Sequence, residues 1–127
     1  MSAVPKQSSR ESSVRVKLNV LREAVEGKRV IMIDDSIVRG TTSDRIVHML
    51  REAGAKEVHM RVSSPPFLWP CYFGTDVPAR EQLIAYNRTV EEIRQVIGAD
   101  SLGYLDCSRL RQMAGDLPIC TGCFTGN

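Results

Sequence analysis

Two aspartates stand side by side directly after an apolar run, in the stretch VIMIDDSIVRGTTS that covers residues 30–43. Adjacent carboxylates repel each other, and a hard cation such as Mg²⁺, or the hydroxyls of a sugar, relieves that repulsion. Asp34 and Asp35 are therefore candidates for binding a metal ion or a sugar.

A cluster of one arginine, one glycine and three hydroxyl residues follows the aspartate pair. Its members are Arg39, Gly40, Thr41, Thr42 and Ser43. We expect them to open a helix, and the first turn of a helix binds phosphate through its unpaired N–H groups and its partial positive charge. The glycine lets the backbone approach a ligand, the hydroxyls add donors, and the arginine adds a full positive charge. Together with the aspartates, this cluster fits a sugar phosphate.

The same stretch also has a purely structural interpretation, in which the aspartates begin a polar turn and Thr41 and Thr42 merely cap a helix. The spacing of the two groups favours the sugar phosphate. A Walker-type nucleotide loop is excluded, because the sequence contains no G-x-x-x-x-G-K-[ST] pattern.

The elements around these residues predict a parallel α/β unit. Residues 29–33 are short, β-branched and apolar on both faces, as in a strand that helices cover on two sides. Residues 57–63 alternate in polarity, which predicts a second strand with Val58, Met60 and Val62 on one face. A helix between the strands makes a β-α-β crossover with parallel strands. The aspartate pair then lies at the carboxyl end of a strand, where open α/β sheets bind ligands.

The intervening helix is predicted over residues 41–53. Thr41 and Asp44 resemble a capping box at its start, and Gly54 is a plausible stop at its end. Its apolar stripe consists of Ile46, Val47, Met49, Leu50 and Ala53.

The rest of the chain predicts shorter elements. Helices are expected over residues 16–26, 80–86, 89–97 and 107–114, and a short strand over residues 101–105. In the third of these helices, Thr89 and Glu92 form a capping box and Gly98 ends the helix. Its inward-facing residues are Ile93, Val96 and Ile97. Residues 1–15 are rich in serine and charge and are expected to form a flexible lead-in.

Residues 65–78 contain four prolines and one glycine, which excludes a regular element. The segment is nevertheless rich in large apolar residues, namely Phe67, Leu68, Trp69, Tyr72 and Phe73. We therefore expect this aromatic loop to pack against another part of the protein.

The bulk properties indicate an ordinary globular domain. The chain has 127 residues, of which 43% are hydrophobic and 25% charged, enough for one domain with a modest core. The net charge of +2 gives no reason to expect a nucleic-acid partner. No apolar run reaches the roughly 18–20 residues that span a bilayer, and no secretory segment follows Met1. We expect a cytoplasmic protein whose four cysteines are free thiols or metal ligands.

Cys120 and Cys123 have the C-x-x-C spacing at which two thiolates reach one metal centre. From the spacing alone, a structural zinc site is the commoner interpretation, and two free thiols near the chain end are the other. Cys71 lies in the aromatic loop.

The stretch over residues 30–43 closely resembles the phosphoribosyl pyrophosphate loop of type I phosphoribosyltransferases. The wording DDSIVRGTTS is similar to that of the glutamine-dependent amidophosphoribosyltransferases. The similarity continues through SVRVKLNVLREAVEGKRV (13–30), SSPPFLWPCYFGTDVP (63–78) and CTGCFTG (120–126).

The resemblance implies an α/β fold, namely a partial type I phosphoribosyltransferase fold with a parallel sheet, flanking helices and a cysteine-bearing C-terminal tail. It implies that ammonia derived from glutamine displaces pyrophosphate from phosphoribosyl pyrophosphate, giving 5-phosphoribosylamine for de novo purine synthesis. By position, Asp34 and Asp35 would hold Mg²⁺ and the ribose hydroxyls as the catalytic pair, and residues 39–43 would grip the 5′-phosphate. Ser36 would contact the ligand beside the pair.

Many members of this family carry a [4Fe–4S] cluster held by four cysteines. The resemblance assigns three of its ligands to Cys71, Cys120 and Cys123, with a structural role that ties the tail to the aromatic loop. In the family the fourth ligand comes from a segment upstream of the phosphoribosyl loop. Cys107 either substitutes for that ligand or is a buried thiol on the last helix, and the second interpretation is favoured.

Family enzymes are several times this length, begin with a glutaminase domain and tend to be homo-oligomers. We therefore expect residues 16–127 to be the C-terminal portion of a phosphoribosyltransferase domain in a longer enzyme, and the chain alone to have an open sheet edge and poor stability. Two alternatives remain. One is a non-catalytic module that binds phosphoribosyl pyrophosphate or nucleotides, and the other is a zinc-stabilised interaction module.

Overall fold

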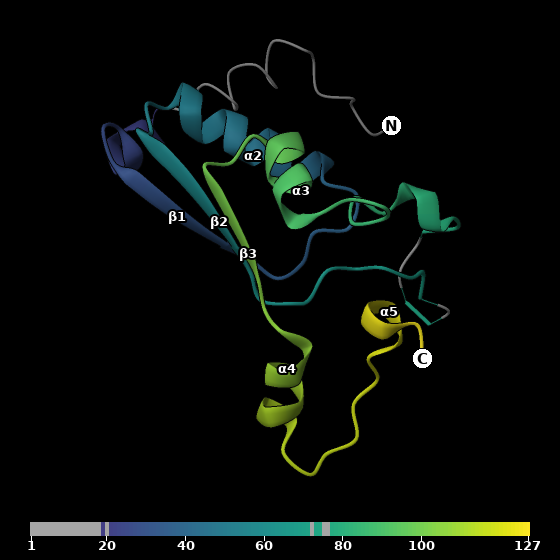
Figure 1. Cartoon of the computed structure of the whole chain (residues 1–127). Coiled ribbons are helices and arrows are strands. Elements are labelled where there is room, and N and C mark those ends of the chain that lie inside the picture. The colour runs from purple at the N-terminus through teal and green to yellow at the C-terminus, as the bar shows by residue number, and fades with distance from the viewer. Residues whose placement is uncertain (1–18, 20, 72, 75–76) are drawn as a thin grey trace, which may run out of the picture.

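The computed structural model describes residues 19, 21–71, 73–74 and 77–127. The described elements run in the order β1 (Arg29–Asp34), α2 (Thr41–Glu52), β2 (Glu57–Val62), the 3-10 turn η1 (Arg80–Gln82), α3 (Val90–Ile97), β3 (Ser101–Tyr104), α4 (Cys107–Ala114) and α5 (Gly122–Thr125) (Figure 1). Residues 21–25 are helical as well. The expected lead-in over residues 1–15 and part of the helix expected over 16–26 lie outside the described residues. No helix in the described ranges is long and apolar enough to cross a membrane.

The three described strands form one parallel sheet in the order β1-β2-β3. At its carboxyl edge, Asp34 is paired with Val62, and Val62 with Tyr104. The prediction of a parallel β-α-β unit is therefore confirmed, as is the short strand expected near residues 101–105. The sheet places Asp34 where parallel strands deliver ligand-binding groups.

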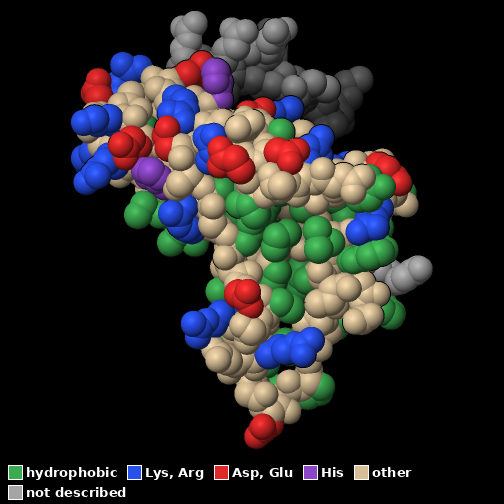
Figure 2. All heavy atoms as spheres, in the orientation of Figure 1, with side chains coloured by type: hydrophobic (Ala, Val, Ile, Leu, Met, Phe, Trp, Pro, Cys, Tyr) green, Lys and Arg blue, Asp and Glu red, His purple; other side chains and the backbone are tan. Residues whose placement is uncertain are grey.

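The core lies between one face of the sheet and the helices α2 and α3 (Figure 1). Side chains alternate across a strand, so Val58, Met60 and Val62 of β2 all point to this side and are almost completely buried. The helices pack against this face through apolar residues at helical spacing, namely Val47 and Leu50 on α2 and Ile93 and Ile97 on α3. Charged side chains gather over the β1, α2 and α3 end of the molecule, and hydrophobic ones fill the region between it and α4 (Figure 2).

The prediction that helices cover both faces of β1 is wrong for the described chain. Val30 and Met32 face the core, whereas Ile31 and Ile33 on the opposite face are 68% and 76% exposed. Crossover connections between parallel strands are right-handed. When each successive strand is added at the same edge of the sheet, right-handed crossovers place all their helices on the same face of the sheet. Helices reach the second face only where the strand order reverses, and the order β1-β2-β3 does not reverse.

The helix ends were predicted with mixed success. Thr89 and Glu92 form the expected capping box, in which the Thr89 hydroxyl accepts from the Glu92 N–H at 3.2 Å and the Glu92 carboxylate accepts from the Thr89 N–H at 3.3 Å. The capping box predicted for Thr41 and Asp44 is wrong, because the N-cap of α2 is Gly40 in a left-handed conformation with no side-chain cap. The helix over 41–53 and its stop at Gly54 are otherwise as predicted.

Three further differences concern exposure and length. Val96, expected to face inward, is 53% exposed on α3. The helix expected over residues 80–86 shrinks to η1, because Leu83 is extended and the next N–H, of Ile84, bonds the carbonyl of Val38. Cys107 is half-buried on α4, whereas a buried thiol was expected. The described part of residues 65–78 forms no regular element, as predicted.

Candidate functional site

A cavity of about 390 Å³ lies at the carboxyl end of β1. Its wall consists of the ten consecutive residues Asp34–Ser43 together with Val77. It therefore brings together all the candidate ligand-binding residues, namely Asp34, Asp35, Ser36, Arg39, Gly40, Thr41, Thr42 and Ser43. Their individual roles stay predictions, but their position around one cavity is a property of the fold.

The backbone orients both aspartates of the pair. The Asp35 N–H donates to Asp34 Oδ1 at 2.8 Å, and the Ser36 N–H donates to Asp35 Oδ1 at 2.7 Å. Asp34 is half-buried at the end of β1 and Asp35 is exposed. Two carboxylates held at the rim of an open cavity suit a hard cation such as Mg²⁺, or sugar hydroxyls, so the donor set fits the expected ion.

The first turn of α2 lines the same cavity. Gly40 has φ 85 and ψ −9, a left-handed conformation that side chains with a Cβ rarely adopt. After this bend the first N–H groups of α2, at Thr41, Thr42 and Ser43, lack partners within the helix by the geometry of its hydrogen bonds. They add anion-binding N–H groups to a cavity that the carboxylates also line. Arg39 is exposed at the same loop.

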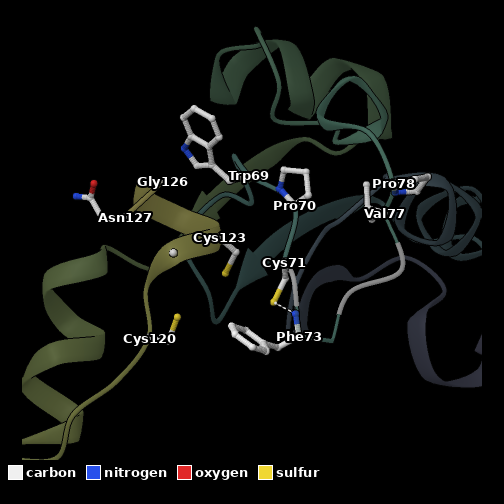
Figure 3. A pocket seen from close by; sticks show the side chains of 11 residues that line it. Trp69, Pro70, Cys71, Phe73, Val77, Pro78, Cys120, Cys123, Gly126 and Asn127 are labelled. Carbon is white, nitrogen blue, oxygen red and sulfur yellow. Dashed lines mark hydrogen bonds between the residues drawn. The ribbon is translucent and has the colours of Figure 1, made fainter.

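A second cavity, of about 690 Å³, contains the three predicted thiol ligands. Cys71 comes from the aromatic loop and Cys120 and Cys123 come from the C-terminal segment, and Figure 3 shows their sulfur atoms turned toward a common space. The Phe73 N–H donates to Cys71 Sγ at 3.4 Å (Figure 3). Cys107 is not among the residues that line this cavity.

The thiols are near one another but do not form a compact single-ion site. Burial raises the pKa of the Cys123 thiol above its usual value, and the nearby ionisable thiols of Cys71, Cys120 and Cys107 raise it further. Within the described ranges, no three His, Cys, Asp or Glu side chains come together closely enough to hold one metal ion. A zinc site needs all its ligands around one ion, whereas a [4Fe–4S] cluster takes one thiolate for each iron, so its cysteines stand apart. Three thiols around one cavity could supply three of the four thiolates that such a cluster takes.

The aromatic loop packs on the C-terminal segment, as the sequence predicts for a loop of this composition. The N–H groups of Leu68 and Trp69 both donate to the Cys123 carbonyl, at 2.9 and 3.0 Å. The rings of Phe67 and Phe124 meet edge to face with their centroids 5.2 Å apart. Protein contacts therefore hold the cysteines of the tail beside Cys71.

Three residues at these cavities carry no local signal in the sequence. Val77 lines both cavities. The Arg80 guanidinium lies 3.5 Å from the Trp69 ring centroid and donates to the Leu68 carbonyl at 2.7 Å. Ile84 contacts the loop before α2, through a hydrogen bond to Val38 and packing next to Gly40. Each acts on a segment distant in the chain, so neither periodicity nor a motif marks it.

The chain is homologous to amidophosphoribosyltransferases over nearly its whole length. It is 56% identical over 126 residues to the amidophosphoribosyltransferase of Archaeoglobus fulgidus, covering 96% of this chain and 28% of that protein. The corresponding values for the Bacillus subtilis enzyme are 55% over 128 residues, 96% and 27%. No protein-family model matches the chain.

A solved structure with the same segment supports the fold. The glutamine phosphoribosylpyrophosphate amidotransferase of B. subtilis, complexed with ADP and GMP, matches with a TM-score of 0.76 and 50% identity, over 98% of this chain and 29% of that one. A partial phosphoribosyltransferase fold is thereby confirmed. The chain spans about a quarter of the length of the curated relatives that it matches.

Proposed function

We propose that residues 16–127 form the phosphoribosyl pyrophosphate-binding portion of an amidophosphoribosyltransferase. We propose a portion and not the whole enzyme because the homology covers only about a quarter of the relatives' length. The observation that carries the proposal is the cavity at the end of β1, whose lining includes both a carboxylate pair and the start of a helix. This arrangement matches the two ends of a ribose phosphate. The proposal includes a cytosolic location and a homo-oligomeric enzyme.

In the proposed reaction, the nitrogen lone pair of ammonia forms a bond to the anomeric carbon of the ribose. The bond from that carbon to pyrophosphate breaks, pyrophosphate leaves with the electron pair, and the new ammonium group loses a proton to water. The transition state has oxocarbenium character, so catalysis depends on placement and charge rather than on a nucleophilic side chain. The ammonia derives from glutamine.

Different residues of the cavity would bind different parts of the substrate. Asp34 and Asp35 would hold the ribose hydroxyls and Mg²⁺, which when bound neutralises charge on the pyrophosphate. The N–H groups and hydroxyls of residues 41–43 would bind the 5′-phosphate, with Arg39 adding positive charge. Ser36 would contact the ligand beside the aspartates. A substitution that removes the charge of Asp34 or Asp35 should therefore weaken the binding of phosphoribosyl pyrophosphate. Removal of a carboxylate charge outside the cavity should leave this binding unchanged.

The cysteine cavity is the proposed site of the [4Fe–4S] cluster, held by Cys71, Cys120 and Cys123. When bound, the cluster would add a covalent tie between the aromatic loop and the C-terminal segment, which already contact each other. A visible absorption band in the blue region, together with iron and sulfide after anaerobic reconstitution, tests this part, and zinc in their place contradicts it.

The decisive experiment is calorimetric titration of the chain with phosphoribosyl pyrophosphate and Mg²⁺. We expect binding that weakens by about ten- to a hundred-fold in Asp35→Asn. The exposed Asp116→Asn is the matched control and should bind like the wild type. No binding to the wild-type chain contradicts the proposal. Binding without phosphoribosylamine formation from ammonia favours a non-catalytic module.

A further inference from the structure

A buried isoleucine that is distant in the chain packs against residues 38–40, the end of the loop between β1 and α2. We call residues 35–40 the phosphate loop, after the proposed function. Ile84 is only 3% exposed and follows η1. Its N–H donates to the Val38 carbonyl at 2.9 Å. A Cβ placed on Gly40 would overlap Ile84 Cδ1 and lie 3.4 Å from Ile84 Cγ1, so this side chain fills the space next to the glycine.

Ile84 is itself held firmly. It belongs to the main core cluster, and its neighbours Leu83 and Ala85 are 1% and 4% exposed. The Arg88 guanidinium donates to the Ile84 carbonyl at 3.1 Å. The contact therefore joins the phosphate loop to the rigid core rather than to a mobile surface side chain.

The start of α2 needs such a support. Helices usually begin with a side-chain oxygen that accepts an N–H of the first turn, but Gly40 offers no side chain and α2 has no side-chain cap. The direction of the first N–H groups then depends on the backbone of residues 38–40. Ile84 touches this backbone at both ends, through a hydrogen bond at Val38 and through packing at Gly40.

We propose that Ile84 is a positioning residue for the phosphate site. It fixes residues 38–40 so that the first N–H groups of α2 converge on the 5′-phosphate, while Ile84 itself does not line the cavity. This inference rests on the proposed function for the identity of the ligand. The glycine is required for the same reason, because any side chain at position 40 would displace Ile84.

The first test uses Ile84→Val, which removes only the Cδ1 methyl group, with Ile97→Val as the matched control. Ile97 is a fully buried isoleucine at the end of α3, and its substitution removes the same single methyl group. We expect Ile84→Val to weaken the binding of phosphoribosyl pyrophosphate with Mg²⁺ about three- to ten-fold. Ile97→Val should bind within about two-fold of the wild type at a similar melting temperature. Equal affinities in the two variants overturn the proposal.

A double-mutant cycle with Gly40→Ala tests the contact itself. The left-handed strain that Gly40→Ala introduces is present with either side chain at position 84, so it cancels in the cycle. Ile84→Val removes the atom that an added Cβ would strike. The double variant should therefore bind at least about three-fold more tightly than the product of the two single effects. Additive effects show that Ile84 does not act through Gly40, and they contradict the proposal.

A readout without ligand separates this inference from the proposed function. Amide hydrogen exchange at residues 41–44 should accelerate about three- to ten-fold in Ile84→Val and stay unchanged in Ile97→Val. If the wild type binds no phosphoribosyl pyrophosphate but shows this exchange pattern, the ligand is wrong and the positioning role stands. If exchange at residues 41–44 is the same in both variants, the positioning role is wrong.

Discussion

Gly126→Ala should release the C-terminal segment from the aromatic loop. A Cβ at this position would lie 2.7 Å from both Cε2 and Nε1 of the Trp69 ring, closer than such atoms approach in proteins. The ring cannot retreat freely, because the Arg80 guanidinium stacks on it at 3.5 Å from the centroid. Gly126 also has φ 82, where alanine is strained by about 1 kcal/mol.

The destabilisation by Gly126→Ala cannot exceed the free energy of the contacts that attach the C-terminal segment to the aromatic loop. The two hydrogen bonds to the Cys123 carbonyl contribute about 1 kcal/mol each, and the edge-to-face pair of Phe67 and Phe124 about 1 kcal/mol. The segment can detach locally, so a penalty above roughly 3 kcal/mol leads to detachment rather than to global unfolding. A change of that size raises the detached fraction by about a hundred-fold.

The assay is alkylation with iodoacetamide, followed for each cysteine by mass spectrometry. We expect the modification rate of Cys123 to rise about ten- to a hundred-fold in Gly126→Ala, with Cys107 on α4 as the internal reference. Gly98→Ala is the matched control, because Gly98 has a similar left-handed conformation but its Cβ would meet only Val47 at 4.0 Å. A Cys123 rate within about two-fold of the wild type refutes the reasoning.

Three further predictions concern the stability of the α/β unit. The pKa of Asp100 is lowered, first by a hydrogen bond from a backbone N–H of β2 and then by Arg51. A lowered pKa means that the ionised carboxylate stabilises the folded state. This stabilisation is present above the pKa of about 3.9 of an unfolded aspartate and is lost as the pH falls through the lower folded value. Asp100→Asn should lower the free energy of unfolding in urea by about 1 kcal/mol at neutral pH, and the difference should vanish in acid. Tyr104 has a buried hydroxyl with no hydrogen-bond partner among the described residues, and burial raises its pKa to about 12, so Tyr104→Phe should stabilise by up to about 1 kcal/mol. Because an unfolded tyrosine ionises near a pKa of about 10, the same substitution should remove the loss of stability that the wild type shows as the pH rises from about 10 to about 12. On the open face, Ile33→Thr should change stability by less than about 0.5 kcal/mol, whereas Ile97→Thr should cost more than about 2 kcal/mol in the same urea titration.

Local patterns in the sequence predicted those features that depend on neighbouring residues. The strand, loop and helix that surround Asp34 and Asp35 follow from the apolar run, the glycine and the period of the helix. The capping box predicted at Thr41 was wrong because the N-cap of α2 is the preceding residue, Gly40. Its left-handed bend is packed on Ile84, which is distant in the chain and leaves no local signal.

Features that depend on strand order or on distant segments could not be read from the sequence. The exposed Ile31 and Ile33 have the apolar character of a covered face, and their exposure follows from an order of strands that no local pattern fixes. Val77 and Arg80 likewise have ordinary sequence surroundings. Val77 lines both cavities and Arg80 stacks on Trp69 because the fold brings together segments that are separate in the sequence.

The segment between the aromatic loop and α3 connects the two cavities. Val77 lines both of them, Arg80 stacks on Trp69 at the cysteine cavity, and Ile84 supports Gly40 at the phosphate cavity. The two cavities therefore share Val77 and are both contacted by the segment over residues 77–88. Coupling between two binding sites is reciprocal, so in the proposed function any effect of a ligand at the thiols on binding at the end of β1 must equal the reverse effect. The residues that line the two cavities come from separate short motifs, but Val77 belongs to both linings, so the two cavities share part of their structure.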